Sequence, residues 1–218
     1  MTKKSIQIHL IFFFLLPMAI HAQTFLGFKA GLLTTPSIVY TDVKYSNSTI
    51  DFQSSFAVSG MIKRQVVKYF TIGTNINYDF YKADFKSSWY NPDGESGSKE
   101  ATYEFGFLGL YLYPQFNFGK TVQFFFNFGF YYGVLTNSSV KVAGEESHAK
   151  DDIMSSVIGL ASEIGLQYAI NQNWQVFLDI SGKRVQSLVI DNGLQAQYDL
   201  TLSFGFFFKI SKGKNHTE

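Results

Sequence analysis

The sequence contains no cysteine, only 4 prolines among 218 residues, and no excess of charge of either sign. A chain without cysteine cannot carry the N-terminal lipid anchor of a lipoprotein. Because 18 Lys and Arg are matched by 17 Asp and Glu, there is no basic excess to neutralise nucleic-acid phosphates, and we expect no nucleic-acid partner. Only 16% of the residues are charged while 46% are hydrophobic, a composition that excludes a disordered chain.

Long apolar runs are also missing from most of the chain. Beyond Gln23 no segment approaches the roughly 18 consecutive apolar residues of a membrane-spanning helix. Before it, Lys3 and Lys4 precede an apolar stretch about half as long as such a helix. We interpret residues 1–22 as a secretory signal peptide that is cleaved after Ala22, so the mature chain is expected to be exported.

The rest of the chain shows an alternating pattern of side chains. In residues 122–134 one parity is apolar throughout, whereas the other includes Gln, Asn and Gly. A period of two predicts β-strands with one apolar face. Eight such segments occur, at residues 24–34, 54–65, 69–82, 102–115, 122–135, 155–170, 174–188 and 196–210. They exceed the about 5–6 residues of an average strand and reach the roughly 9–11 that cross a bilayer when tilted.

The connections between these segments alternate in length. Residues 35–53, 83–101 and 136–154 are long and polar, whereas residues 66–68, 116–121 and 171–173 are short. Short turns at one rim and long loops at the other are typical of outer-membrane barrels. We therefore predict an all-β fold: an eight-stranded antiparallel transmembrane β-barrel over residues 23–210, in contact with outer-membrane lipid. Both termini are expected in the periplasm, with a polar tail at residues 211–218.

A soluble eight-stranded barrel with its apolar face inside is the alternative. Runs of Phe and Tyr are too bulky for a narrow lumen, however, whereas the glycines of the polar parity suit a crowded interior. Tyr69, Tyr113, Tyr168 and Trp174 fall near the short turns, and Tyr78, Tyr103, Tyr132 and Tyr198 near the long loops. Two aromatic girdles favour the membrane barrel.

The last segment, from Ser203 to Ile210, reads Ser-Phe-Gly-Phe-Phe-Phe-Lys-Ile. It resembles the C-terminal assembly signal of bacterial outer-membrane barrels, which implies the barrel-insertion machinery as a partner. Such signals usually end the chain with an aromatic residue, whereas here Ile210 holds that place and a charged tail follows. An ordinary amphipathic last strand is the alternative interpretation.

The first segment of the mature chain, Phe25 to Leu32, reads Phe-Leu-Gly-Phe-Lys-Ala-Gly-Leu. This Gly-x-Lys-x-Gly-Leu opening resembles the PorT-like outer membrane protein β-barrel domain family, small bacterial barrels of the porin-like superfamily. The resemblance implies an integral outer-membrane protein without assigned catalytic residues. Some relatives assist a secretion system, but the family name describes a fold more than a task.

Histidine is absent from every predicted strand. His9 and His21 lie in the signal peptide, His148 in a polar loop and His216 in the tail. A serine nucleophile needs a base within hydrogen-bond reach, so a lipid-modifying enzyme would depend on His148. Without cysteine or a strand histidine, a transition metal lacks its usual ligands. We predict a protein that is not an enzyme and has no catalytic residue, metal site or cofactor.

Ionisable residues do occur on the parity assigned to the lumen. The predicted charge network consists of Lys29, Lys63, Asp79, Glu104, Glu163, Asp179, Lys183 and Asp199, with Lys209 on the same parity. Basic and acidic residues nearly balance, and buried charges require partners, which predicts ion pairs that plug the barrel. A selective pore more naturally carries rings of one sign. A narrow passive pore for small solutes or protons along these residues is the alternative.

Binding is then expected at the long loops, because loops on rigid scaffolds carry function. Trp89 and Tyr90 lie among polar neighbours in the second loop. Aromatic side chains there could contact a protein or glycan partner, or form the upper edge of the girdle. The sequence thus favours a structural, surface-interaction or secretion-accessory role.

Overall fold

The computed structural model describes residues 23–36, 38–42, 46–90, 96–142, 145–147, 155–186 and 196–210. The predicted signal peptide, the tail after residue 210 and His148 lie outside these residues. Within them no helix is long and apolar enough to cross a membrane.

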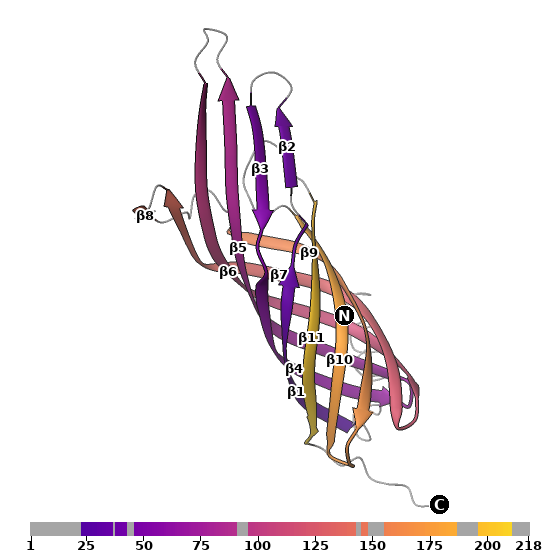
Figure 1. Ribbon diagram of the computed structural model, residues 1–218. Helices are drawn as coiled ribbons and strands as arrows, with labels where there is room; N and C mark the ends of the chain where they lie inside the picture. Colours follow the sequence, from indigo (N-terminus) through magenta and orange to yellow (C-terminus); the bar gives the residue numbers. More distant parts are fainter. Residues whose placement is uncertain are drawn as a thin grey trace, which may run out of the picture.

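Eight long strands close into a barrel (Figure 1). These strands are β1 (Gln23–Thr34), β4 (Ser55–Val67), β5 (Phe70–Tyr90), β6 (Ser96–Gly119), β7 (Val122–Val142), β9 (Ser156–Ala169), β10 (Trp174–Gln186) and β11 (Ala196–Lys209). Each pairs antiparallel with both neighbours, and β1 pairs with β11 from Phe25 opposite Lys209 to Thr34 opposite Leu200. The predicted eight-stranded antiparallel barrel is confirmed.

The short turns gather at one end of the barrel, which we call the turn end. Only Lys120 and Thr121 separate β6 from β7. Gly119 enters this turn with φ of 115°, a backbone conformation that side chains with a Cβ rarely adopt. The first residue of β1 and the last of β11 lie at this same end, as an even number of strands requires.

At the opposite end, the hairpin end, three strands continue far beyond the others. β5 has 21 residues, β6 has 24 and β7 has 21, so they exceed a bilayer crossing by about ten residues, or roughly 30 Å at about 3.3 Å per residue. Two further strands, β2 (Ile38–Asp42) and β3 (Ser46–Phe52), extend this sheet along β5, and β8 (Glu145–Ser147) pairs with β7.

This extended sheet, which we call the hairpin sheet, corrects one expectation. Much of residues 35–53, 83–101 and 136–154 was predicted to be loop, yet β5 and β6 remain paired up to Tyr90 and Ser96. The cause is cross-strand pairing, because Thr and aromatic residues in these segments suit a sheet although their polarity resembles that of loops.

Large apolar side chains cover the outer surface of the barrel. On β7, Phe126, Phe128 and Phe130 point outward, and Phe130 is 68% exposed. Tyr168, Trp174 and Tyr198 are also exposed near the two rims. Such an outer surface is stable only when lipid covers it.

The lumen is filled, and aromatic rings take part in filling it. Phe25, Met61, Phe125, Phe177 and Phe207 form a buried cluster toward the turn end, the turn-end layer. A larger cluster toward the hairpin end, the hairpin-end layer, includes Leu33, Tyr81, Phe105, Phe107, Val157 and Val185. The prediction that such rings are too bulky for the interior is therefore wrong for these positions.

Glycines on neighbouring strands explain how the rings fit. The positions where Gly205, Gly165 and Gly73 would carry a Cβ are occupied by the rings of Phe177, Phe125 and Tyr113. Tyr113 is 3% exposed and Tyr103 packs against the hairpin-end layer, so neither belongs to the girdles where they were predicted. Glycine on one strand and an aromatic ring on the next together fill the narrow barrel.

Candidate functional site: the charged midsection of the lumen

A polar cavity lies in the barrel midsection, between the two apolar layers. Its volume is about 50 Å³, which leaves room for roughly three water molecules. Along β10 the inward side chains run in the order Phe177, Asp179, Ser181, Lys183 and Val185. The polar residues thus occupy the middle of the strand, with an apolar residue on either side.

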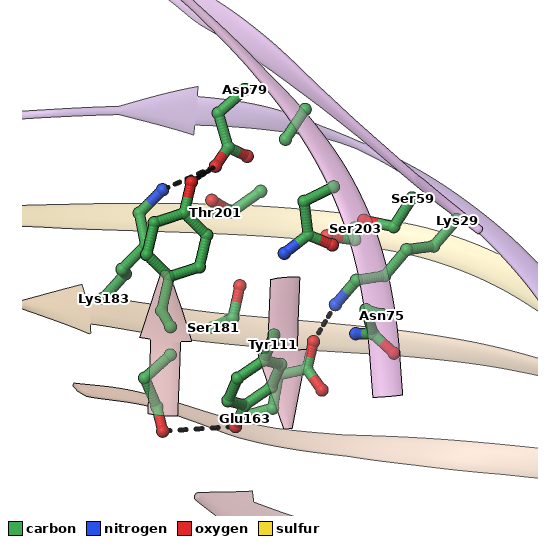
Figure 2. A pocket seen from close by; sticks show the side chains of 14 residues that line it. Lys29, Ser59, Asn75, Asp79, Tyr111, Glu163, Ser181, Lys183, Thr201 and Ser203 are labelled. Carbon is green, nitrogen blue, oxygen red and sulfur yellow. Dashed lines mark hydrogen bonds and ion pairs between the residues drawn. The ribbon is translucent and has the colours of Figure 1, made fainter. Parts of the chain in front are cut away.

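Lys29 organises one side of this cavity (Figure 2). Its Nζ forms an ion pair with Glu163, which Figure 2 marks. A second ion pair joins Nζ to Asp179 Oδ2 at 3.5 Å. Asn127 donates to Glu163 Oε2 at 2.6 Å and accepts from the Tyr111 hydroxyl at 2.7 Å. Lys29, Glu163 and Asp179, which we call the Lys29 triad, come from β1, β9 and β10.

Lys183 organises the other side. Its Nζ lies 2.8 Å from Asp79 Oδ2 and 3.3 Å from Asp199 Oδ2. The Tyr131 hydroxyl donates to Asp79 Oδ2 and the Tyr81 hydroxyl to Asp199 Oδ2, both at 2.7 Å. Lys183, Asp79 and Asp199 form the Lys183 triad, with residues from β10, β5 and β11.

The structure thus divides the predicted charge network into two groups. Glu163 and Asp179 pair with Lys29, whereas Asp79 and Asp199 pair with Lys183. Each triad contains one ammonium group and two carboxylates.

Lys63 lies inside the barrel but apart from both triads. It is 3% exposed, donates to Gln167 Oε1 at 2.9 Å and places its Nζ 3.5 Å from the centre of the Phe207 ring. Among the described residues no carboxylate forms an ion pair with it. Lys63 therefore belongs to the turn-end layer, and a cation–π contact replaces the expected acidic partner.

Glu104 was predicted to face the lumen, and this prediction is wrong. It pairs with Lys82 at 3.4 Å, and the two side chains are 30% and 38% exposed. The adjacent Phe105 is fully buried and faces the interior. On β6 the aromatic face points inward and the face with Leu108 points outward, which places Glu104 on the outer side.

Tyrosines and an asparagine complete the site, and sequence reasoning did not assign them to it. Tyr81, Tyr131 and Asn127 donate hydrogen bonds to the carboxylates, and Tyr111 donates to Asn127. A signal was present, because Tyr81, Tyr131 and Asn127 have the same parity along their strands as the predicted inward glycines and charges.

Two other predicted sites lie outside or at the limit of the described structure. The backbone of Trp89 and Tyr90 lies at the end of β5, opposite Gly97 and Ser96 of β6, while their side chains fall outside the described part. His148, the residue on which an enzyme would depend, is not among the described residues. In the portion that is described, no three or more His, Cys, Asp or Glu side chains are grouped to hold a metal ion.

Comparison with known proteins identifies the family. The sequence matches the model described as outer membrane protein beta-barrel domain over residues 18–189. The chain belongs to this family. It is an integral outer-membrane β-barrel protein, so its exposed apolar surface contacts lipid and its turn end faces the periplasm.

Solved structures of other outer-membrane proteins are similar to this chain at low sequence identity. Neisserial surface protein A (NspA) shares 13% identity with a TM-score of 0.51, over 87% of this chain and 99% of that chain. OprG from Pseudomonas aeruginosa shares 12% identity with a TM-score of 0.47, over 87% and 97%. Ail, the attachment invasion locus protein of Yersinia pestis, shares 13% with a TM-score of 0.42, over 87% and 97%. No curated protein matches the sequence.

Proposed function

We propose that this outer-membrane barrel is a surface-interaction protein whose hairpin sheet presents the binding surface. The observation that carries this proposal is the length of β5 and β6, which stay paired well beyond the apolar band of the barrel. β3 adds to the edge of β5 from Ser46 opposite Trp89 to Phe52 opposite Ala83. A stiff sheet outside the cell presents side chains to a partner with less loss of entropy than a flexible loop.

The filled lumen supports a binding role over a transport role. A solute crossing the barrel would have to pass the turn-end layer, both triads and the hairpin-end layer. Aromatic contacts tighten these layers, since the rings of Phe177 and Phe207 stack at 4.8 Å and those of Tyr81 and Phe105 at 5.2 Å. We propose that the ion pairs and the apolar layers together plug the barrel.

A narrow pore for small solutes or protons is the second candidate, because the midsection cavity is polar. The two candidates differ in conductance. The plugged barrel should give no reproducible single-channel steps in a planar lipid bilayer, whereas regular steps would favour the pore. The variant Phe207→Ala removes one ring of the turn-end layer. It serves as the control because it shows the conductance of a partly opened lumen.

The opening at Phe25–Leu32 supports a PorT-like relative and, with it, a secretion-accessory form of surface interaction. The segment Ser203–Ile210 supports recognition by the barrel-insertion machinery. We propose a non-enzymatic role, and activity toward lipid or peptide substrates that is lost in His148→Ala would contradict it.

Trp89 and Tyr90 are the proposed contact residues for a protein or glycan partner. The test replaces residues 85–101 by an Asn-Gly turn that joins Asp84 to Thr102, which are directly opposite each other. Pull-down from outer membranes with chemical cross-linking, together with a glycan array, should give a partner for the full chain and none for the shortened one. The double variant Trp89→Ser/Tyr90→Ser is the matched control that keeps the backbone of the hairpin.

Folding of each variant is checked by heat-modifiable migration on a detergent gel. If a shortened, folded barrel captures the same partner as the full chain, the hairpin sheet is not the binding surface. If the full chain captures nothing in either assay while the barrel is folded in the membrane, a purely structural role replaces the proposed one.

A further inference from the structure

We infer that the lumen mouth at the turn end is a binding site for an acidic peptide segment in the periplasm. This site goes beyond the proposed surface interaction, because it lies at the opposite end of the barrel. Residues 23–27, 61–73, 113–125, 165–177 and 205–210, which form the turn end, contain no Asp or Glu. They do contain five basic residues, namely Lys63, Arg64, Lys68, Lys120 and Lys209. A region with charge of one sign attracts ligands of the opposite sign.

Two of these lysines belong to the inner face of the barrel and lie at the same level. Lys63 on β4 and Lys209 on β11 are both directly opposite Phe25 of β1. They have the same parity along their strands as the buried Met61 and Phe207. Since neighbouring strands lie about 4.8 Å apart, the Cα atoms of the two lysines are roughly 10 Å apart. One extended segment can therefore reach both ammonium groups.

Neither lysine forms an ion pair with a carboxylate that the structure describes. Lys63 is only 3% exposed, donates to Gln167 Oε1 and places its Nζ near the Phe207 ring. An ammonium group has three donors, so donors remain for a further acceptor. Residues 211–218 contain two lysines and one glutamate and add no surplus of negative charge. Because a buried charge without a counter-charge is costly, a carboxylate from another molecule would stabilise this end.

A ring of amide side chains surrounds the two lysines. Six strands place a glutamine on the inward parity toward the turn end: Gln23, Gln65, Gln115, Gln123, Gln167 and Gln175. Neighbours in the ring are in register, with Gln23 opposite Gln65 and Gln123 opposite Gln167. Each amide offers both donors and an acceptor, which matches the backbone N–H and C=O groups of a peptide.

Gln175 distinguishes a peptide from a simple anion. Its Oε1 is buried and has no hydrogen-bond partner among the described atoms. Gln175 is directly opposite Phe207, whose ring lies 3.5 Å from Lys63 Nζ. Buried acceptors are nearly always paired in native proteins. A fully ionised oxyanion has no donor for this oxygen, whereas a peptide N–H supplies one beside the lysines. We call Lys63, Lys209 and Gln175 the mouth site.

The inward position of the mouth site separates it from the bilayer. Lipid covers the outer surface, where Tyr69 and Trp174 are exposed at the turn end, whereas Lys63 and Lys209 have the inward parity of their strands. Because the turn end faces the periplasm, the ligand approaches from the periplasmic side and not from within the membrane.

The experiment places the full mature chain in nanodiscs of phosphatidylcholine, which carries no net charge. A fluorescently labelled peptide of four Glu-Ala repeats is the probe. Its fluorescence anisotropy should show saturable binding that weakens as salt is added. The matched peptide of four Gln-Ala repeats keeps the backbone but removes the carboxylates, and it should bind at least about tenfold more weakly.

Variants locate the bound peptide. Lys209→Gln and Lys63→Gln should each weaken binding of the acidic peptide about tenfold, because each removes one charged donor. Lys86→Gln makes the same change of charge on the hairpin sheet and should bind as the wild type does. Coupling with a carbodiimide, which joins a carboxylate directly to an amine, should link the peptide to Lys209, as mass spectrometry can establish.

Several outcomes would overturn the inference. Equal affinity for the two peptides would show that the lysines do not select an acidic ligand. If Lys120→Gln, in the exposed turn between β6 and β7, weakens binding as much as Lys209→Gln, the general charge of the turn end holds the peptide and the mouth site does not. Absence of saturable binding would contradict the site, and retention of added phosphatidylglycerol that depends on Lys209 would then identify a lipid headgroup as the ligand. If Lys63→Gln fails to refold, Lys209→Gln and the coupling experiment decide the question.

Discussion

The barrel contains lysine–carboxylate pairs in two regions, the lumen midsection and the hairpin sheet, and the two sets differ in solvation. In the Lys29 triad the side chains of Lys29 and Asp179 are 9% and 0% exposed. On the hairpin sheet Lys86 lies 3.9 Å from Glu100, and these side chains are 58% and 73% exposed. The charged groups are the same in both regions, and only their exposure to solvent differs. The surroundings of an ion pair therefore decide how much it contributes to stability.

The largest effect is expected from Lys29→Met, which leaves Glu163 and Asp179 without their ammonium group. Breaking a buried pair from one side costs about 3–5 kcal/mol, and urea unfolding in lipid vesicles followed by gel migration measures it. The triple variant with Glu163→Gln and Asp179→Asn should recover part of the loss. If Lys29→Met is as stable as the wild type, the midsection is not held together by its charges.

Phe126→Lys introduces a charge into a third environment, the lipid. At the bilayer midplane this substitution destabilises by about 2–4 kcal/mol, because the outer surface offers neither water nor a partner. The same unfolding experiment applies. Phe126→Leu keeps an apolar surface and should be nearly neutral, so a comparable loss in both variants would indicate packing and not charge as the cause.

Gly205→Ala tests how tightly the rings are packed beneath the Lys29 triad. The added Cβ would meet the backbone oxygen of Phe28 at 2.5 Å as well as the Phe177 ring, and overpacking costs about 1–3 kcal/mol. Gly60→Ala is the matched control, because no atom lies within 4 Å of its added Cβ. If both variants were as stable as the wild type, the turn-end layer would accommodate the added Cβ at little cost.

The smallest effect is expected from Lys86→Met on the hairpin sheet. Exposed pairs contribute about 0–1 kcal/mol, and this one is also screened by salt. Its free energy of unfolding should match that of the wild type within error. A loss as large as that of Lys29→Met would remove the distinction between the two regions.

Much of the fold could be predicted from the sequence because a membrane barrel repeats one pattern. The alternation in residues 122–134 reflects lipid on one side of β7. The same pattern in the other segments predicted the number, the order and the approximate ends of the eight barrel strands. The hairpin sheet could not be predicted, since residues 82–90 of β5 lack the strict alternation of apolar and polar residues that marks the lipid-facing strands. Strand pairing there depends on neighbours distant in sequence.

The sequence predicted which residues belong to the site better than it predicted how they pair. Parity was sufficient to place Lys29, Asp79 and Asp179 inside. It failed for Glu104, because β6 turns its aromatic face inward and aromatic residues had been assigned to the lipid side. Parity also carries no information on which lysine meets which carboxylate, since that depends on how far the strands are staggered.

The pairing of β1 with β11 has a consequence for how the protein folds. Phe25 and Lys209 are opposite each other, so the first strand has no permanent partner on one side until nearly the whole chain has been made and exported. Contacts between residues so distant in sequence slow folding. Until the barrel closes, this edge of the first strand stays open and the apolar outer faces of the strands have no lipid to cover them.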